Sequence, residues 1–274
     1  MVYTGKMKEI DFTKTEGLGN DFIIIDDRSR RISLTPAEVR RLCDRHFGIG
    51  ADGLILLGPG APPADLSWDF FNADGSVAEM CGNGIRCIGA YVVERGLCAP
   101  DQEELVILTA VGARSIRILR DREGHFEAAA VSMGNAELRP EALSIEGTQF
   151  TCVSMGNPHA VTFVDDVSSA PLATLGPLIE TDAAFPQGAN VGFCEIGDRA
   201  SLKLRVWERG VGETLACGTG ACAAAVAAHA RGLCGLSVTV QLPGGALDIS
   251  IEAATLAVTM TGPARIVYEG SITL

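Results

Sequence analysis

An internal repeat is the feature that most constrains this chain. The segment CGNGIRCIGAYVVERGLC runs from Cys81 to Cys98, and CGTGACAAAVAAHARGLC runs from Cys217 to Cys234. Both begin with Cys-Gly-x-Gly and end with Arg-Gly-Leu-Cys, at a constant offset of 136 residues (217 − 81). Self-similarity at a fixed spacing is typical of a duplicated structural unit.

Shorter motifs outside these segments repeat at almost the same offset. Gly19-Asn20 recurs as Gly156-Asn157, and Gly50-Ala51-Asp52 recurs as Gly188-Ala189-Asn190. We therefore predict two similar halves related by a pseudo-twofold axis. In such an arrangement Cys81 and Cys217 would face each other across the cleft between the halves.

Composition excludes several classes of function. The 274 residues are 47% hydrophobic and 20% charged, which is typical of a globular protein with room for two cores. A formal charge of −12 argues against a nucleic-acid partner, because phosphate backbones bind clustered Lys and Arg. The N-terminus has no apolar core of signal-peptide length, and no apolar run reaches 18 residues. We expect a cytoplasmic protein without a membrane segment.

The cysteines and histidines predict neither a disulfide framework nor a metal site. Nine cysteines are an odd number, and without an export signal we expect thiols. There is no C-x-x-C, and the four histidines do not cluster in the sequence; they are His46, His125, His159 and His229.

Short β-branched apolar runs dominate both halves, and each half has one strong central helix after its Cys-Gly-x-Gly. This pattern indicates the α+β class rather than alternating β-α-β units. A further helix is predicted to start at Thr35-Pro36 and to continue until Gly48. Residues 48–53 satisfy G-x-G-x-x-G, but they follow a helix and precede a strand, so we do not expect a dinucleotide site.

The cysteine that opens each repeat can carry chemistry. A thiol at a helix start faces unpaired backbone N–H groups and the positive end of the helix dipole, which favour a thiolate or a nearby carboxylate. Inversion of a carbon centre needs a base on one face and an acid on the other, and two equivalent thiols meet that need. A hydrolase needs only one nucleophile, and a dithiol oxidoreductase more often uses C-x-x-C. A purely structural role for both cysteines stays open.

The lysines do not favour pyridoxal phosphate as a cofactor, because its Schiff base needs a buried lysine. Three of the four lysines, Lys6, Lys8 and Lys14, lie near the N-terminus, and Lys203 is expected to point outward from a strand. We therefore expect a reaction that uses no cofactor.

Several motifs together resemble the diaminopimelate epimerase family over essentially the whole chain. They are GLGNDF, RHFGIGADG, FNADGS, CGNGIRC, GNPHAV, GAN, ERGVGET and ACGTGAC. The resemblance implies two domains, each a barrel-like mixed β-sheet around a central helix, with the active site in the cleft between them. It implies that residues 1–124 and 264–274 form the first domain and residues 125–263 the second.

The same resemblance implies an isomerase that interconverts LL- and meso-2,6-diaminopimelate in lysine and peptidoglycan precursor biosynthesis. The expected enzyme uses no pyridoxal phosphate and can form a homodimer. Cys81 and Cys217 would be its two acid/base catalysts, and His159 and Glu208 would bias their protonation. The substrate would be bound by Asn20, Asn72, Gly82, Asn83, Asn157, Asn190, Glu208, Arg209, Gly218 and Thr219.

One departure limits the resemblance: some family members have a substrate-contacting Gln where this chain has Gly53. The remaining seven cysteines match no catalytic position, which predicts structural roles. They are Cys43, Cys87, Cys98, Cys152, Cys194, Cys222 and Cys234. The asparagines beside glycines could instead form turns. A cofactor-independent racemase of another amino acid, or a non-catalytic binding protein of this fold, are the alternatives.

Overall fold

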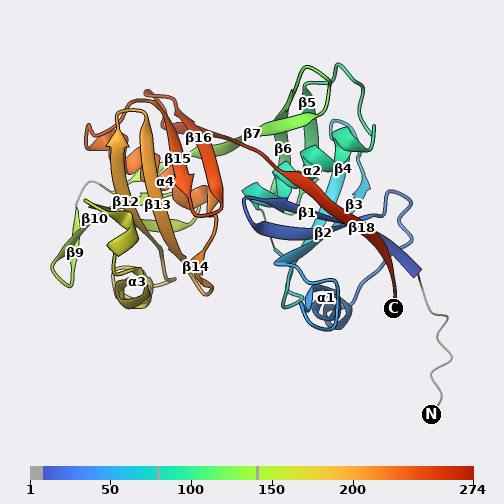
Figure 1. Ribbon diagram of the computed structural model, residues 1–274, viewed down its shortest axis with the longest axis horizontal. Helices are drawn as coiled ribbons and strands as arrows, with labels where there is room; N and C mark the ends of the chain where they lie inside the picture. Colours follow the sequence, from blue (N-terminus) through green and yellow to red (C-terminus); the bar gives the residue numbers. More distant parts are fainter. Residues whose placement is uncertain (1–8, 79–80, 140–141) are drawn as a thin grey trace, which may run out of the picture. The chain divides into compact units, whose positions relative to one another are not determined.

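The computed structural model describes residues 9–78, 81–139 and 142–274 (Figure 1). The chain divides into two compact units, one comprising residues 1–129 and 263–274 and the other residues 130–262. The expected boundary after residue 124 falls in a turn, whereas the observed division falls within a strand, β7 (Phe126–Asn135), that runs from one unit into the other.

Among the described residues of the first unit, seven strands pair in the order β18-β1-β2-β3-β4-β5-β6. The pairs β2–β3 and β4–β5 are parallel and the other neighbours are antiparallel. Its elements are β1 (Glu9–Gly17), β2 (Asn20–Asp26), α1 (Pro36–Cys43), β3 (Gly53–Pro59), β4 (Leu66–Asn72), α2 (Gly82–Glu94), β5 (Glu104–Thr109), β6 (Gly112–Arg120) and β18 (Arg265–Thr273).

The second unit repeats this topology. Its strands β10-β11-β12-β13-β15-β16 have the same alternation, with β11–β12 and β13–β15 parallel. Its elements are β8 (Glu137–Leu138), β9 (Leu143–Ile145), β10 (Thr148–Ser154), β11 (Pro158–Val164), η1 (Val167–Ser169), α3 (Leu172–Glu180), β12 (Asn190–Asp198), β13 (Ser201–Glu208), β14 (Gly212–Thr214), α4 (Gly218–Ala230), β15 (Ser237–Leu242), β16 (Gly245–Ile251) and β17 (Ala257–Gly262). The prediction of a duplicated α+β fold is confirmed.

Each unit is built around one helix of 13 residues, α2 or α4. Every residue of α4 from Gly220 to Ala228 is buried, and the helix contacts seven strands of its own unit: β10, β11, β12, β13, β15, β16 and β17. A helix that is apolar on all sides must be surrounded by other elements, and Figure 1 shows strands around both helices. This packing fixes where the N-terminus of each helix lies within its unit. None of the helices in the described parts of the chain is long and apolar enough to cross a membrane.

Strand register corrects one detail of the repeat. Phe22 pairs with Gly53 and His159 pairs with Asn190, so both positions share an offset of 137 residues (159 − 22 and 190 − 53). Gly50 and Gly188, each at positive φ, keep the offset of 138. The second half therefore has one residue fewer between this glycine and its strand. The counterpart of Asn190 is Gly53, and the counterpart of Asp52 is Ala189.

The start of α1 was predicted correctly, but its end was not. Thr35 Oγ1 accepts from Glu38 N (3.3 Å) and Glu38 Oε2 accepts from Thr35 N (2.7 Å), which forms a capping box. The helix ends at Cys43 rather than continuing to Gly48. Asp44 leaves the helical region, and its carboxylate accepts from His46 N (2.7 Å) and Phe47 N (2.8 Å), so a side chain takes over these backbone donors.

Candidate active site

Cys81 and Cys217 are the N-cap residues of α2 and α4. Each has an extended backbone, and its sulfur accepts from the backbone N–H three residues on, at 3.5 Å from Gly84 and 3.4 Å from Gly220. A helix N-terminus leaves N–H groups without intrahelical partners and carries partial positive charge. The helix N-terminus by itself therefore favours negative charge at both sulfurs.

Gly220, three residues after the second thiol, is closely packed. A Cβ at Gly220 would lie 3.1 Å from both Cys217 Sγ and Val206 Cγ2. Gly218 and Thr219 form the first turn of α4, as Gly82 and Asn83 form that of α2. The first turn of each helix thus presents backbone donors beside a thiol, an arrangement suited to a carboxylate.

We define the first half-site as the expected residues of the first unit: Asn20, Asn72, Cys81, Gly82 and Asn83. Asn20 Oδ1 accepts from Asn83 Nδ2 (3.0 Å) and from Cys81 Sγ (3.7 Å). Asn72, at the end of β4, is exposed and donates to Ser76 Oγ (2.9 Å). The structure therefore brings Asn20 and Asn83 to Cys81, whereas the Asn72 side chain is hydrogen-bonded within the turn that follows β4.

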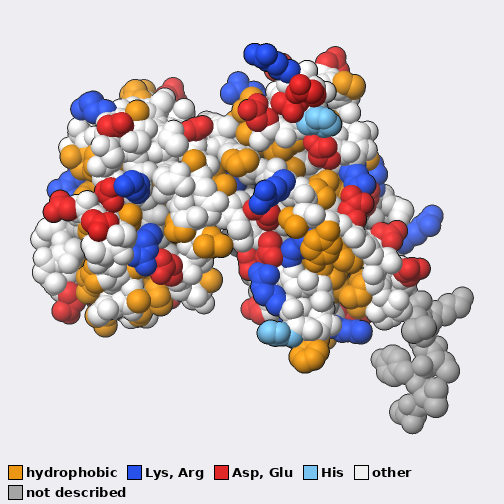
Figure 2. Space-filling model, in the orientation of Figure 1, with side chains coloured by type: hydrophobic (Ala, Val, Ile, Leu, Met, Phe, Trp, Pro, Cys, Tyr) orange, Lys and Arg blue, Asp and Glu red, His pale blue; other side chains and the backbone are white. Residues whose placement is uncertain are grey.

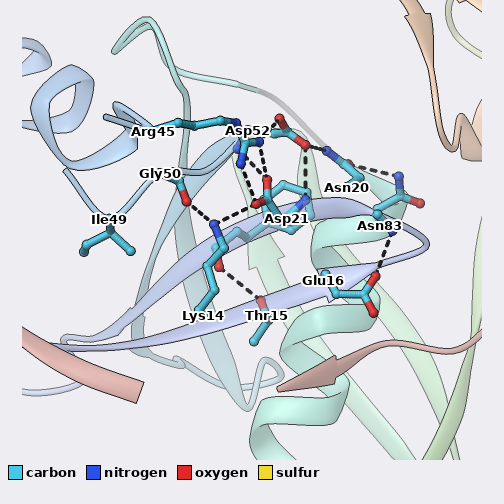
Figure 3. Close-up of polar contacts among 12 residues, drawn as sticks. Lys14, Thr15, Glu16, Asn20, Asp21, Arg45, Ile49, Gly50, Asp52 and Asn83 are labelled. Carbon is cyan, nitrogen blue, oxygen red and sulfur yellow. Dashed lines mark hydrogen bonds and ion pairs between the residues drawn. The ribbon is translucent and has the colours of Figure 1, made fainter. Parts of the chain in front are cut away.

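A network of charged residues binds the Asn20 side chain through its Nδ2 atom (Figure 3). Its Nδ2 donates to Asp52 Oδ2 at 2.8 Å, and Arg45 bridges Asp52 (2.7 Å) and Asp21 (2.7 Å). Lys14 pairs with Asp21 at 2.7 Å and also donates to Gly50 O. Burial by itself raises the pKa of Asp21, but hydrogen bonds from Arg45 and Lys14 outweigh it and hold this pKa well below its usual range.

We define the second half-site as the expected residues of the second unit: Asn157, His159, Asn190, Glu208, Arg209, Cys217, Gly218 and Thr219. Asn157 Nδ2 donates to Thr219 Oγ1 (3.4 Å), whose hydroxyl lies 3.6 Å from Cys217 Sγ. His159 Nε2 lies 3.1 Å from Asn157 Oδ1. Because a carbonyl oxygen only accepts, this contact requires the proton on Nε2.

Three further side chains of the second half-site form hydrogen bonds with neighbouring residues. Asn190 Oδ1 accepts from Arg209 N (3.0 Å), and Arg209 Nη1 donates to Gln187 O (2.9 Å). Glu208 Oε1 accepts from Thr214 Oγ1 at 2.5 Å. Arg209 is exposed, and a guanidinium has further donors that can bind a carboxylate.

Burial controls the protonation of this half-site. It raises the pKa of Cys217 well above the usual value, and the Glu208 carboxylate adds to the effect by repulsion. Burial, together with the nearby Arg209, also lowers the pKa of His159 to about 3. The imidazole is therefore neutral at neutral pH and acts as a hydrogen-bond partner rather than as a cation.

The other cysteines include buried thiols of low reactivity. Burial raises the pKa of Cys43 to about 11 and those of Cys87 and Cys194 to about 12, and it also raises those of Cys152 and Cys234. Thiols of this kind are inert at neutral pH. All nine cysteines lie within the described residues, and none of them forms a disulfide.

The described residues hold no candidate metal cluster, and the two lysines among them, Lys14 and Lys203, each pair with a carboxylate. In residues 9–78, 81–139 and 142–274, no group of three or more His, Cys, Asp and Glu side chains could hold a metal ion. Lys203 is exposed on β13 and pairs with Glu195 at 2.7 Å. Lys6 and Lys8 lie outside the described residues. Lys14 is buried, contrary to the impression from its terminal position, and its ammonium is engaged by Asp21 and Gly50.

Comparison with known proteins identifies the family. The sequence profile of the diaminopimelate epimerase family matches residues 12–139 and 151–267. The chain belongs to the diaminopimelate epimerase family. It is 46% identical to the diaminopimelate epimerase of Teredinibacter turnerae, with 96% of this chain and 99% of the relative covered. It is 44% identical to that of Alkalilimnicola ehrlichii, over 97% of this chain and 99% of the relative.

Solved structures of more distant proteins share the fold. A phenazine biosynthesis protein from Bacillus anthracis has a TM-score of 0.76 at 15% identity and covers 98% of this chain and 100% of its own. A hydroxyproline epimerase from Agrobacterium vitis has a TM-score of 0.73 at 16% identity and covers 99% of this chain and 93% of its own. At such identities the likeness establishes the fold alone.

The network behind Asn20 was not predicted from the sequence. Asp52 and Arg45 lie in the motif RHFGIGADG, where Asp52 reads only as part of a repeated turn. The signal that could have found Asp52 is its position next to Gly53 at the start of a strand parallel to β2, because neighbouring parallel strands bring their first residues together.

Proposed function

We propose that this chain interconverts LL-2,6-diaminopimelate and meso-diaminopimelate, in lysine and peptidoglycan precursor biosynthesis, without pyridoxal phosphate. Family membership supports the reaction, since relatives bearing the name diaminopimelate epimerase match 96% and 97% of the chain at 46% and 44% identity. The single observation that carries the mechanism is the duplication of an N-cap thiol at the start of a buried central helix.

The proposed reaction is a proton transfer at one carbon. One of the two thiols, as a thiolate, removes the α-proton from one face, and the other thiol delivers its own proton to the opposite face. The substrate leaves with inverted configuration, and the two sulfurs have exchanged protonation states. Reaction in the other direction restores them, so that no external acid, base or redox partner is needed.

Binding of the reacting centre is assigned to the two helix starts. Backbone N–H groups of Gly82, Asn83, Gly218 and Thr219 would hold the α-carboxylate, and charge that develops on it during proton removal would be stabilised by the same donors. This assignment is supported by the extended N-cap geometry of both cysteines.

Selectivity is assigned to the polar side chains. Asn20, Asn72, Asn157 and Asn190 would bind polar groups of the substrate, since an amide offers both donor and acceptor. Arg209 would grip the distal carboxylate and Glu208 an amino group. Exposure of the Arg209 guanidinium supports its role, and His159 and Glu208 would bias the protonation of the thiols.

Two finer proposals concern the setting of the enzyme. We place it in the cytoplasm, and we propose a homodimer. Dimerisation is supported by Val267 and Tyr268, apolar side chains of β18 that are 53% and 44% exposed. Figure 2 shows hydrophobic side chains gathered over this strand. Sedimentation analysis of the purified chain would distinguish a dimer from a monomer.

The decisive experiment is exchange of the α-proton in D₂O. Purified protein given LL-diaminopimelate should incorporate deuterium at the α-carbon and form the meso isomer. Cys81→Ala and Cys217→Ala should each abolish epimerisation, because each direction needs one base and one acid. Near-normal turnover by either variant would refute the two-thiol mechanism, and absence of exchange in the unaltered protein would favour a binding protein. Faster turnover of a monocarboxylic amino acid would identify a racemase of another substrate.

A further inference from the structure

The two ends of the Asn20 amide have different partners. Nδ2 donates to Asp52 Oδ2 at 2.8 Å, whereas Oδ1 accepts from Asn83 Nδ2 at 3.0 Å (Figure 3). Oδ1 also accepts from Cys81 Sγ at 3.7 Å. If the Asn20 amide were reversed, its N–H donor would face the Asn83 Nδ2 donor. Its oxygen would then face the Asp52 carboxylate. An ionised carboxylate only accepts hydrogen bonds. Asp52 therefore sets the orientation of this amide.

Asp52 is itself held in place. Arg45 Nη2 donates to Asp52 Oδ1 at 2.7 Å, and the same guanidinium binds Asp21 through both of its terminal nitrogens at 2.9 and 2.7 Å. The backbone N–H of Asp21 donates to Asp52 Oδ2 (3.2 Å), and that of Asp52 donates to Asp21 Oδ1 (3.0 Å). These contacts tie the starts of β2 and β3 together, so the carboxylate that faces Asn20 cannot turn away without breaking ion pairs.

The orientation of Asn20 decides one of the contacts of Cys81, whose sulfur also accepts from Gly84 N at 3.5 Å. Its sulfur lies beside a carbonyl oxygen, which can accept the S–H proton but offers nothing to a thiolate. A hydrogen bond made only by one protonation state favours that state. With the amide reversed, Cys81 would meet an N–H donor, which favours the thiolate instead. The orientation set by Asp52 therefore favours the protonated form of Cys81.

The second half-site differs at the equivalent position. There Ala189 replaces Asp52, and Asn157 directs its nitrogen rather than its oxygen toward the helix start, where it donates to Thr219 Oγ1 at 3.4 Å. Its oxygen faces His159 Nε2 at 3.1 Å. Equivalent asparagines thus present an acceptor beside Cys81 and a donor beside the neighbour of Cys217. The two thiols are not interchangeable, although their helices are duplicated.

We propose that Asp52 is a positioning residue that holds the Asn20 carbonyl oxygen toward Cys81 and so keeps this thiol protonated in the ligand-free site. In the epimerisation proposed above, on which this consequence rests, Cys81 then carries its proton until substrate binds. The effect of Asp52 on the thiol itself does not depend on that function and can be measured without substrate.

Other charged groups near the N-terminus of α2 also influence the protonation of Cys81. Arg86, in the same helix, donates from Nη1 to Gly82 O at 3.3 Å, and Glu16, at the end of β1, accepts from Gly19 N at 2.8 Å. Behind Asn20 lie Asp52, Asp21 and Arg45, with Lys14 pairing to Asp21. Replacing Asp52 removes one negative charge as well as one acceptor, and the experiment must separate the two effects.

The test is the pH dependence of alkylation of Cys81 by iodoacetamide. Trypsin releases residues 46–86, in which Cys81 is the single cysteine, and residues 96–114, in which Cys98 serves as internal reference. For Asp52→Asn the midpoint for Cys81 should fall by about one pH unit, a tenfold rise in thiolate at a given pH, because Asn20 is freed to reverse. The same substitution in an Asn20→Ala background should change the midpoint by less than about a third of that.

Asp69→Asn is the matched control, since Asp69 also pairs with an arginine in the same unit (Arg30, 3.3 Å) but without contact to Asn20. It should leave the Cys81 midpoint unchanged, and thermal unfolding establishes that each variant is folded. If Asp52→Asn lowers the Cys81 midpoint equally with and without Asn20, Asp52 acts through its charge alone and the proposal is overturned. An unchanged or raised Cys81 midpoint in Asp52→Asn would also overturn it. Failure of the unaltered protein to exchange substrate protons would refute the proposed function while leaving this result intact.

Discussion

Replacing Gly53 with alanine should destabilise the first unit by about 1 to 3 kcal/mol, the usual cost of forcing extra volume into a packed core. Gly53 starts β3 and pairs with Phe22 on one side and Asn72 on the other. A Cβ built there would lie 2.7 Å from Phe70 Cε2 and 2.8 Å from Phe71 O. Carbon atoms in contact normally stand about 3.5 to 4.0 Å apart.

The strain cannot be relieved by a simple movement of the ring. Phe70 is 6% exposed, and its ring lies 5.8 Å from that of Phe22 and 5.4 Å from that of Trp68, centre to centre. The second close atom is a backbone oxygen within the sheet. The glutamine that some family members have at this position would meet the same atoms. Gly53→Gln should therefore destabilise this chain rather than add a substrate contact.

Thermal unfolding followed by circular dichroism measures the effect. At about 3 °C per kcal/mol, the transition of the first unit should fall by about 3 to 9 °C in Gly53→Ala. Gly235→Ala is the control, because the methyl group that it adds would have Arg199 O as its nearest neighbour, at 3.6 Å. Its stability should change by less than about 0.5 kcal/mol. Equal melting temperatures for the two variants would refute the packing argument.

Three further outcomes are expected. Mild oxidation should inactivate the enzyme reversibly through a Cys81–Cys217 disulfide, and inactivation without this crosslink in peptide maps would exclude the mechanism. Arg209→Met should reduce kcat/KM for diaminopimelate by about 10²- to 10³-fold, the equivalent of about 3 to 4 kcal/mol, with unchanged melting and thiol reactivity; a smaller loss would remove Arg209 from the distal site. Asp21→Asn should destabilise the protein less at pH 3 than at pH 7. The folded-state pKa of Asp21 is depressed, so its stabilisation is present above the unfolded value of about 3.9 and shrinks as the pH falls; an effect independent of pH would contradict the ion pairs.

The repeat was sufficient to predict the class and the duplication of the fold, because the residues that start the two helices are chemically special and lie next to each other in the sequence. Cys81 and Cys217 cap their helices as local sequence predicts. Contacts of Asn20 with Asn83, 63 residues away along the chain, depend on the packing of α2 against β1 and β2, which no local pattern encodes.

The failures of prediction have the same origin. The end of α1 depends on a competition between helix propensity and the carboxylate of Asp44, and the carboxylate wins by binding two backbone donors. The burial of Lys14 depends on two partners from other segments, Asp21 and Gly50. The role of Asp52 depends on strand register, since a shift of one residue would turn its side chain to the other face of the sheet.

The path of the chain through the two units has a consequence for its synthesis. β18 pairs with β1 from Glu9↔Thr273 to Glu16↔Arg265, so the first unit joins the two ends of the described chain, whereas the second unit is continuous from residue 130 to 262. On the ribosome the second unit can fold as soon as it emerges, while β1 keeps one unpaired edge until translation has passed β18. The half that is made first is therefore finished last, and throughout that interval its open edge is available to other nascent chains.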